Sequence, residues 1–373
     1  MKICIDCRLM YYRTAGISHY TRRLTQALAA LPEAGQTFSL SVLMDRRDAN
    51  IDWLPANVKV IRTITPAHHK LEPLALPAEL AALQIQPARF NILHSPDFIT
   101  CAGTFKKVIT IHDLYFMEHP EVMSADGARY YGRICRSAQQ ADCIVAVSHF
   151  TRADILRLIP GIDRDKIAVI HEAADAPKNS EFKTQAAKSL LFVGTLEPRK
   201  NIMTLLKALQ RLPAEVSLTV AGAAGWGGGD ARQMASDLNV LDRVTFTGRV
   251  SDAELDALYR HARLLAMPSL YEGFGLPVLE AMARGTPVVC SNAGALPEVA
   301  GDAALLHDPL DDAALAQHIG ALWHNDAVHA DYRRRGIARA AQFSWQRAAQ
   351  ETLGIYKMAL GHVRRASESA SHN

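Results

Sequence analysis

The 373-residue sequence has little of what marks a metal or redox protein. It has six cysteines, and Cys4 and Cys7 form a CxxC pair with no second pair nearby. A structural zinc site needs two further ligands, and a strand through this pair would point the two side chains to opposite faces. We therefore expect buried, reduced thiols and no metal site.

The chain also lacks an excess of charge of one sign. Its 41 Lys and Arg residues stand against 38 Asp and Glu residues, and the net charge of +3 is too small to indicate nucleic-acid binding. The small basic excess lies in residues 1–178, with 21 basic against 18 acidic side chains. Such an excess is compatible with a solvated face, or with peripheral contact to the anionic inner face of a cell membrane.

Long hydrophobic runs are missing as well. The N-terminal MKICIDCRLM does not have the pattern of a signal peptide, and no apolar stretch reaches the roughly 20 residues that span a bilayer. With 49% hydrophobic and 21% charged residues, the composition is typical of a globular protein with a sizeable core. The length favours two domains, and we expect a cytoplasmic protein.

What the sequence does contain is an alternation of short apolar segments with amphipathic ones. The strands expected in the first half are 3–6, 38–44, 58–61, 92–94, 107–111, 143–148 and 167–171, with helices at 17–31, 125–141 and 151–158. In the second half the expected strands are 190–194, 218–221, 244–246, 264–267, 287–290 and 304–306, with helices at 202–212, 233–238, 252–261, 277–284 and 313–323. Alternating β and α units predict parallel sheets covered by helices on both faces.

A polar, turn-rich stretch at 172–188 separates the two runs and is the best candidate for a linker. The sequence thus predicts an α/β protein with two Rossmann-like, doubly wound domains, residues 1–176 and 186–344. A further amphipathic helix is expected within 345–363, and the polar tail 364–373 has the composition of a disordered segment.

The stretch 192–201, FVGTLEPRKN, ends a predicted strand and places two cations before a helix. Adjacent cations such as Arg199 and Lys200 at a strand-to-helix turn can neutralise a pyrophosphate. A solvated basic turn would have the same sequence, so this stretch alone leaves both interpretations open.

The stretch 269–287, SLYEGFGLPVLEAMARGTP, places two acids on either side of a glycine-rich turn. The two glycines let the backbone bend closely under a ligand, Pro277 favours a helix start, and the amides there can bind an anion. Glu280, one turn inside the helix, can accept hydrogen bonds from a ribose diol, whereas Glu272 can reach another part of the ligand. The alternative is an ordinary strand-loop-helix junction in which Glu280 interacts with the helix dipole.

In these motifs the sequence resembles the family 4 glycosyltransferases, which have the GT-B fold. The resemblance rests on YEGFGLPVLEAMARGTPVV, FVGTLEPRKN, TGRVSDAELDALY and SNAGALPEVAGDAALL, and it extends from Gly16-Ile17 to Phe343-Ser344-Trp345. It implies retaining transfer of a sugar from a nucleotide-sugar to an acceptor hydroxyl. The donor would bind the C-terminal domain and the acceptor the N-terminal domain, with the two domains facing a cleft. The last helix would cross back to the N-terminal domain.

The resemblance also implies roles for individual residues. Glu280 would bind the ribose, and Glu272 the hydroxyls of the donor sugar. Arg199 and Lys200 would hold the diphosphate. The implied catalytic residues are His112, Glu272, Arg199 and Lys200, with His112 near the reacting face of the sugar. The implied nucleotide-sugar ligands are Gly16, Gly194, Arg199, Lys200, the backbone of Arg249 and Val250, Phe274, Gly275, Leu276 and Glu280.

The identity of the donor follows from the resemblance as well. Thr195 stands where many relatives have an arginine, and Arg199 would supply that charge instead. The EPRKN form resembles polysaccharide mannosyl- and rhamnosyltransferases, which favours GDP-mannose as donor and a glycan or lipid-linked saccharide as acceptor. A dTDP-rhamnose or UDP-sugar transferase, an epimerase, a phosphorylase and a nucleotide-sugar-binding partner are the alternatives. No DxD acid pair follows a predicted strand, so metal-independent transfer is expected.

The histidines of the first half carry weaker signals. His94 and His112 both stand at the ends of predicted strands, and His112 with its neighbour Asp113 matches the family better. His68, His69 and His119 have no such context, so ordinary roles are expected for them. Further acceptor candidates, which are also compatible with an ordinary amphipathic surface, are Tyr115, Phe116 and residues 129–136.

Overall fold

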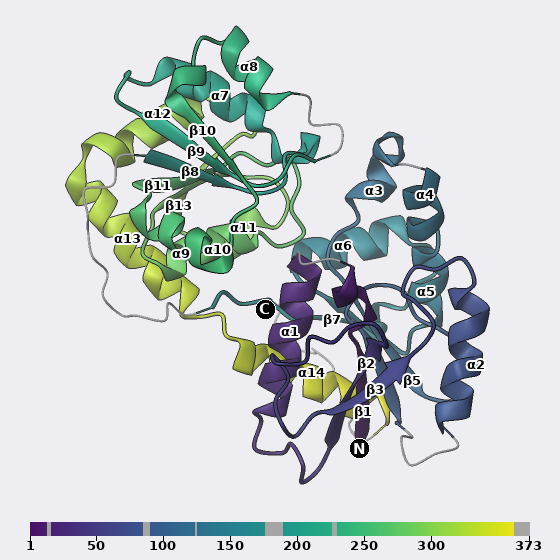
Figure 1. Ribbon diagram of the computed structural model, residues 1–373. Coiled ribbons are helices and arrows are strands. Elements are labelled where there is room, and N and C mark those ends of the chain that lie inside the picture. Colours follow the sequence, from purple (N-terminus) through teal and green to yellow (C-terminus); the bar gives the residue numbers. More distant parts are fainter. Residues whose placement is uncertain (13–15, 85–89, 124, 176–188, 226–229, 362–373) are drawn as a thin grey trace, which may run out of the picture. The chain divides into compact units, whose positions relative to one another are not determined.

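The computed structural model describes residues 1–12, 16–84, 90–123, 125–175, 189–225 and 230–361. These residues form two compact units, each built on one parallel sheet (Figure 1). The first unit holds Met1–Val147, Thr151–His171 and the helix that begins at Trp345, and the second holds Ser148–Phe150 and Glu172–Ser344. The expected α/β architecture with two doubly wound sheets is confirmed. The expected tail at 364–373, and residues 176–188 of the expected linker, lie outside the described residues.

The sheet of the first unit has seven parallel strands in the order β3-β2-β1-β4-β5-β6-β7. Its strands are β1 (Lys2–Asp6), β2 (Ser39–Asp45), β3 (Lys59–Thr63), β4 (Ile92–Ser95), β5 (Lys106–Ile111), β6 (Cys143–Ala146) and β7 (Ile167–Val169). The helices that accompany it are α1 (Gly16–Ala29), α2 (Glu72–Gln84), α3 (Tyr115–Glu118), α4 (Ala125–Tyr131), α5 (Ile134–Gln140), α6 (His149–Leu158) and α14 (Trp345–Ala359). The order of strands reverses between β1 and β4, and sheets of this kind bind ligands outside the carboxyl ends at such a switch point.

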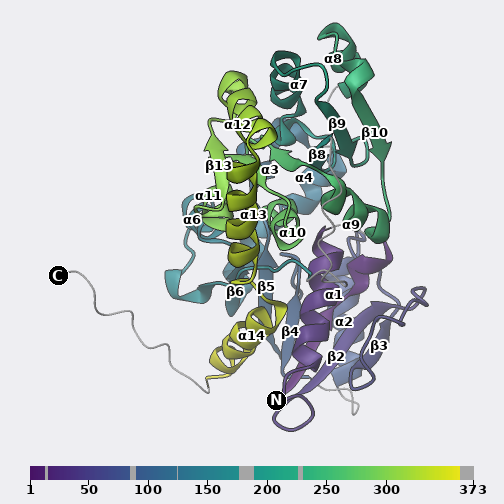
Figure 2. The same cartoon turned by 90° about the vertical axis from the view of Figure 1, so that its left-hand side faces the viewer.

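Alternate residues of β1 pack on opposite faces of this sheet. Cys4 packs with Leu43 on one face, whereas Ile5 and the following Cys7 pack on the other. The second face is covered by α1 and α14, which lie against each other (Figure 2). The last helix therefore returns to the first unit, as expected. All six thiols are free and five are buried, while Cys135 is partly exposed.

The sheet of the second unit has six parallel strands in the order β10-β9-β8-β11-β12-β13. Its strands are β8 (Ser189–Val193), β9 (Ser217–Ala221), β10 (Val244–Gly248), β11 (Leu264–Met267), β12 (Val288–Ser291) and β13 (Ala304–His307). Its helices are α7 (Ile202–Arg211), α8 (Ala231–Asp237), α9 (Asp252–His261), α10 (Leu276–Ala283), α11 (Leu296–Ala300), α12 (Asp312–His324) and α13 (Asp326–Ala340). Here the switch point lies between β8 and β11.

The prediction of a single helix over 125–141 is wrong, because this segment forms two helices, α4 and α5. The break falls at Gly132 and Arg133, just after the N–H of Gly132 bonds the carbonyl oxygen of Ala128 at 2.9 Å. Glycine weakens a helix interior by roughly 0.5–1 kcal/mol relative to alanine, so the helix ends easily at this position. The break brings Arg133 to 3.2 Å from the carboxylate of Glu72, the first residue of α2.

Two longer helices, α2 and α13, had no clear signal in the sequence. Helix α2 is largely apolar and has Pro77 inside it, so it lacks the apolar spacing of a surface helix. The buried residues of α13 are Gly336 and Ala340, and a Cβ at Gly336 would lie 3.2 Å from Met282 Cγ on α10. Helix α13 lies against α10 (Figure 2). It packs there through small residues, which produce no apolar period. Across the described ranges, no helix is long and apolar enough to cross a membrane.

Candidate active site

The switch point of the second sheet lies between the loops that follow β8 and β11. After β8 come Gly194 and a short 3-10 helix, Pro198–Lys200. After β11 comes the turn that leads to Glu272. The N–H of Leu270 in this turn donates to the carbonyl oxygen of Arg199 at 2.7 Å. The two motifs that the sequence analysis singled out are therefore neighbours in the fold.

Glu272 is the centre of the polar contacts between these two loops. Its Oε1 accepts hydrogen bonds from Lys200 Nζ at 2.6 Å and from Ser269 Oγ at 2.7 Å. Its Oε2 lies 3.4 Å from Arg199 Nη1, and Arg199 Nε donates to Glu197 Oε2 at 2.9 Å. Glu272 is 5% exposed and Lys200 is 7% exposed, so this ion pair is buried. Both cations expected to hold a diphosphate are thus fixed by carboxylates.

The charges of this cluster shift the pKa values of its members. Burial alone would raise the pKa of Glu272, but the charges of Lys200 and Arg199 and the hydrogen bonds from Lys200 and Ser269 outweigh it, so the pKa is lowered. Burial lowers the pKa of Lys200, and the charge of Glu272 offsets this only in part. Glu272 is therefore ionised at neutral pH, and an entering anion would meet two cations that are already in place.

The backbone of Glu272 is held by the loop that follows β12. A Cβ added at Gly294, which has φ +63°, would lie 2.6 Å from both the nitrogen and the oxygen of Glu272. The N–H of Ala295 donates to the carbonyl oxygen of Glu272 at 2.9 Å. Only glycine allows this close approach. Gly294 belongs to the SNAGALPEV stretch, for which the sequence had suggested no role.

The glycine-rich turn before α10 brings the backbone to the start of that helix. Gly275 has φ +106°, and a Cβ there would lie 2.6 Å from Leu296 Cδ2. Pro277 occupies the first turn of α10, as the sequence predicts. The side chain of Phe274 is buried, and the ligand contact that the resemblance implies for this residue stays a prediction. At the start of α10, Pro277 has no N–H and the N–H of Val278 donates to the carbonyl oxygen of Gly275 at 3.0 Å, so the N–H of Leu276 is the group that suits an anion.

Glu280 lies in α10 and is oriented by a tyrosine that the sequence analysis missed. The hydroxyl of Tyr259, a fully buried residue of α9, donates to Glu280 Oε2 at 2.8 Å. Burial raises the pKa of Glu280, although the Tyr259 bond and the charge of Arg284 act in the opposite direction. Arg284 Nη1 donates to the carbonyl oxygen of Glu280 at 3.0 Å, and its Nε pairs with Asp256 Oδ1 at 2.8 Å. Tyr259 is the last residue of the TGRVSDAELDALY stretch. Its position in a motif that carries the family resemblance was the signal that could have identified it from the sequence.

Arg249 and Val250 lie between β10 and α9, at the carboxyl end of the same sheet. Arg249 is exposed and Val250 is half-buried. Helix α9 then begins with a capping box, in which Ser251 and Glu254 bond to each other's backbone. The cap fixes the chain directly after Arg249 and Val250, whose backbone the resemblance assigns to the nucleotide-sugar.

Gly16 and His112, the two expected site residues of the first half, belong to the first unit. His112 directly follows β5, and its Nε2 donates to the carbonyl oxygen of Pro96 at 2.9 Å, since a carbonyl can only accept. The ring of Tyr20 packs edge-on against His112 with 4.8 Å between centroids. Gly16 begins α1, one turn before Tyr20, and is exposed. Their roles toward a donor stay predictions.

His94 has a packing role, which removes it from the catalytic candidates. It lies within β4 and is fully buried, with Nδ1 2.6 Å from the Tyr356 hydroxyl and Nε2 2.9 Å from Thr110 Oγ1. Burial lowers the pKa of His94 to about 3, so the ring is neutral. Tyr115 and Phe116 are buried as well, which favours packing over an acceptor surface.

Comparisons with known proteins agree with this architecture. The model of Glycosyltransferase Family 4 matches residues 14–176, and that of glycosyl transferases group 1 matches residues 175–342. The fold is also that of a sucrose-phosphate synthase from Thermosynechococcus elongatus, which is 23% identical with a TM-score of 0.78, covering 97% of this chain and 100% of that one. The fold and the two matched halves define a GT-B glycosyltransferase.

Two curated relatives match the chain as well, one over nearly its whole length and one over about half of it. O-antigen chain mannosyltransferase B from Escherichia coli is 32% identical, with 96% of this chain and 100% of the relative aligned. O-antigen chain mannosyltransferase RfbU from Salmonella typhimurium is 31% identical over 48% of this chain and 50% of the relative. The chain therefore belongs to the family 4 glycosyltransferases, and the resemblance in its motifs is confirmed.

The buried ion pair leads to a test of stability. Glu272→Gln is expected to lower the free energy of unfolding by about 3–5 kcal/mol, because it leaves Lys200 buried without its partner. Urea denaturation at pH 7 measures this, with Glu215→Gln on the exposed surface as a matched control. The double variant Lys200→Met/Glu272→Gln is expected to recover part of the loss, since it also removes the unpaired charge. A Glu272→Gln variant as stable as the control would show that the pair does not hold the loops.

Proposed function

We propose that this protein is a retaining mannosyltransferase that moves mannose from GDP-mannose to a hydroxyl of a glycan or lipid-linked saccharide in polysaccharide biosynthesis. Family membership supports sugar transfer, and the two O-antigen mannosyltransferase relatives support mannose and a polysaccharide acceptor. The EPRKN form at residues 197–201 supports the same donor class.

The observation that carries the proposal is the cluster at the switch point of the second sheet. Arg199 and Lys200 are held beside Glu272, and α10 begins with the N–H of Leu276 four residues further on. The leaving group of a nucleotide-sugar is a diphosphate whose negative charge grows as the glycosidic bond breaks. Fixed cations and helix amides stabilise that charge more in the transition state than in the ground state. We infer that these groups carry the electrostatic task without a metal ion.

The proposed reaction breaks one bond at the anomeric carbon and forms one. The bond from C1 to the diphosphate oxygen breaks, and the acceptor oxygen forms a bond to C1 on the same face. The departing phosphate oxygen takes the proton of the acceptor hydroxyl, so charge and atoms balance. Glu272 would orient the sugar hydroxyls, and His112 would contact the sugar near C1.

A panel of nucleotides tests the choice of donor. A ligand that binds only the native state raises its melting temperature, and GDP is expected to raise it more than UDP, dTDP or ADP at equal concentration. GDP-mannose is then expected to be turned over with a glycan acceptor, and proton NMR of the product is expected to show the α anomer. A larger shift of the melting temperature with dTDP or UDP would indicate a dTDP-sugar or a UDP-sugar as the donor. No binding and no turnover with any nucleotide-sugar, in folded protein, would contradict transferase activity.

Glu280 provides a second test, because function and stability should change in opposite directions. Its folded pKa is raised, so ionising it costs the folded state free energy above the ordinary glutamate pKa, and this cost disappears as pH falls below that value. Glu280→Gln removes the cost and is expected to leave the melting temperature at pH 7 equal or higher. Hydrogen bonds to a charged group contribute about 1.5–3 kcal/mol, so GDP affinity is expected to fall about 10- to 100-fold.

Isothermal titration with GDP measures this affinity. Tyr259→Phe is the matched control for orientation, because it keeps the carboxylate and removes the hydroxyl that fixes Oε2. A smaller loss of affinity is expected for it than for Glu280→Gln. Unchanged GDP affinity in Glu280→Gln would rule out the assignment of Glu280 to the ribose.

A further inference from the structure

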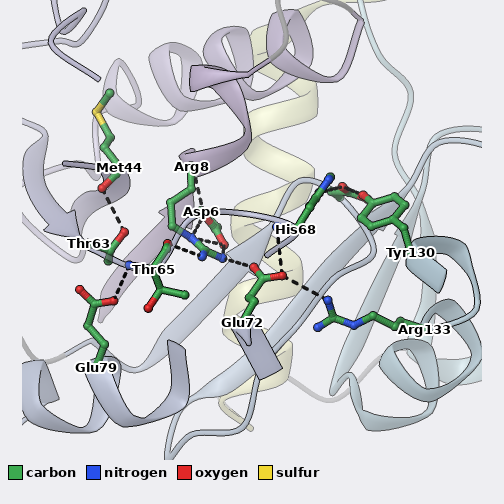
Figure 3. A network of polar contacts seen from close by, with 11 residues as sticks. Asp6, Arg8, Met44, Thr63, Thr65, His68, Glu72, Glu79, Tyr130 and Arg133 are labelled. Carbon is green, nitrogen blue, oxygen red and sulfur yellow. Dashed lines mark hydrogen bonds and ion pairs between the residues drawn. The ribbon is translucent and has the colours of Figure 1, made fainter. Parts of the chain in front are cut away.

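The switch point of the first sheet, between β1 and β4, holds a buried ion network of its own. Arg8 follows β1 and is 2% exposed; its Nη2 lies 2.7 Å from Asp6 Oδ2 and 2.8 Å from Glu72 Oε1 (Figure 3). Its Nη1 donates to the carbonyl oxygen of Thr65 at 3.1 Å. Buried ion pairs are weak evidence of stabilisation, since apolar residues of similar volume often serve as well. The network is therefore better explained by what it holds in place.

Glu72 connects this network to the loop between β3 and α2. Its Oε2 accepts hydrogen bonds from the backbone N–H of His68 at 3.1 Å and from Arg133 Nη1 at 3.2 Å. His68 has φ +63°, a left-handed conformation that costs a residue with a side chain roughly 1–2 kcal/mol. The loop is held further by Glu79, which accepts from the N–H of Thr65 at 3.0 Å. Backbone held in a disfavoured conformation by a buried network is typical of a ligand site.

The loop places the ring of His68 beside two groups from other elements. The ring centroid lies 4.0 Å from that of Tyr130 on α4, and Nε2 lies 3.5 Å from Oδ2 of Asp97, which follows β4. The hydroxyl of Tyr130 also donates to Asp97 Oδ2, while Asp97 Oδ1 accepts from the N–H of Phe98 at 2.6 Å. His68 is 26% exposed and Asp97 is 13% exposed. An imidazole, a carboxylate and an aromatic ring thus meet at the carboxyl end of the sheet.

The charge of this arrangement restricts the ligand. Asp6, Glu72, Glu79 and Asp97 stand against Arg8 and Arg133, which leaves a net charge of −2, or −1 when His68 is protonated. An anion such as a phosphate would gain no net attraction from it. A neutral sugar suits the chemistry better, because a hexose has an apolar C–H face for an aromatic ring and hydroxyls that donate to a carboxylate.

We propose that His68, Asp97 and Tyr130 form a binding site for a neutral hexose, with Arg8 and Glu72 as positioning residues behind it. Calling that hexose part of the acceptor rests on the proposed function, whereas saccharide binding by the site does not. The expectation that His68 has an ordinary role is replaced by this proposal, because its backbone conformation and its contacts with Asp97 and Tyr130 become visible only in the fold.

Saturation-transfer NMR on the full-length protein with saturating GDP tests the site. The probes are the methyl glycosides of mannose, galactose, glucose and rhamnose, and N-acetylglucosamine. At least one probe is expected to give a signal that falls at least fivefold in Asp97→Asn and in Tyr130→Leu, with GDP affinity unchanged. Asp165→Asn, an exposed acid of the same unit, is the matched control and is expected to retain the signal. No signal from any probe in the wild type, or equal signals in both variants, would overturn the site.

The transfer assay separates this site from the proposed function. With GDP-mannose and a glycan acceptor, Asp97→Asn and the positioning variant Glu72→Gln are expected to raise the acceptor KM at least fivefold and leave the donor KM unchanged. If both variants transfer mannose with the wild-type acceptor KM, the proposed hexose site is ruled out and the proposed function still stands. If a saccharide signal depends on Asp97 but no transfer is detected, the proposed hexose site still stands and the proposed function is ruled out.

Discussion

The buried ion pair between Lys200 and Glu272 is the contact on which the second unit's candidate site depends. It connects the loop that follows β8 to the loop that follows β11, and these two strands are neighbours at the switch point of the sheet. Charges removed from water stabilise each other only when the geometry is good and the remaining hydrogen-bonding groups are satisfied, which Ser269 and Arg199 achieve here. The cations that fix the loops are also the ones proposed to stabilise a leaving diphosphate, so one cluster serves the fold and the chemistry.

The first unit repeats this solution with different residues. Arg8, which follows β1, is paired with Asp6 at the end of that strand and with Glu72 at the start of α2. In both sheets an ion cluster lies at the carboxyl ends of the strands, where sheets of this kind bind ligands. The proposals assign a nucleotide-sugar to one crevice and a neutral hexose to the other. The surroundings of the two networks decide this: a neutral cluster of two cations and two carboxylates lies beside a helix start in one unit, and a network with a net negative charge lies beside an aromatic ring in the other.

Much of the fold could be predicted because both faces of a parallel sheet are buried, which makes each strand a short apolar segment. Helix α13 was not predicted, because it packs on α10 through Gly336 and small residues produce no apolar period in the sequence. The motifs around Arg199 and Glu280 were visible because turns and helix starts are local. The pairing of Lys200 with Glu272 joins residues 72 positions apart, and the meeting of His68 with Asp97 depends equally on strand order. Local patterns contain no information about that order, so these contacts needed the structure.

A crystal structure of the protein with GDP-mannose tests the donor site most directly. The expected result is a diphosphate within hydrogen-bonding distance of Lys200 Nζ and Arg199, beside the N–H of Leu276 at the start of α10, with the ribose hydroxyls on Glu280. A bound nucleotide whose phosphates avoid both cations, or whose ribose lies away from Glu280, would contradict the account of this site.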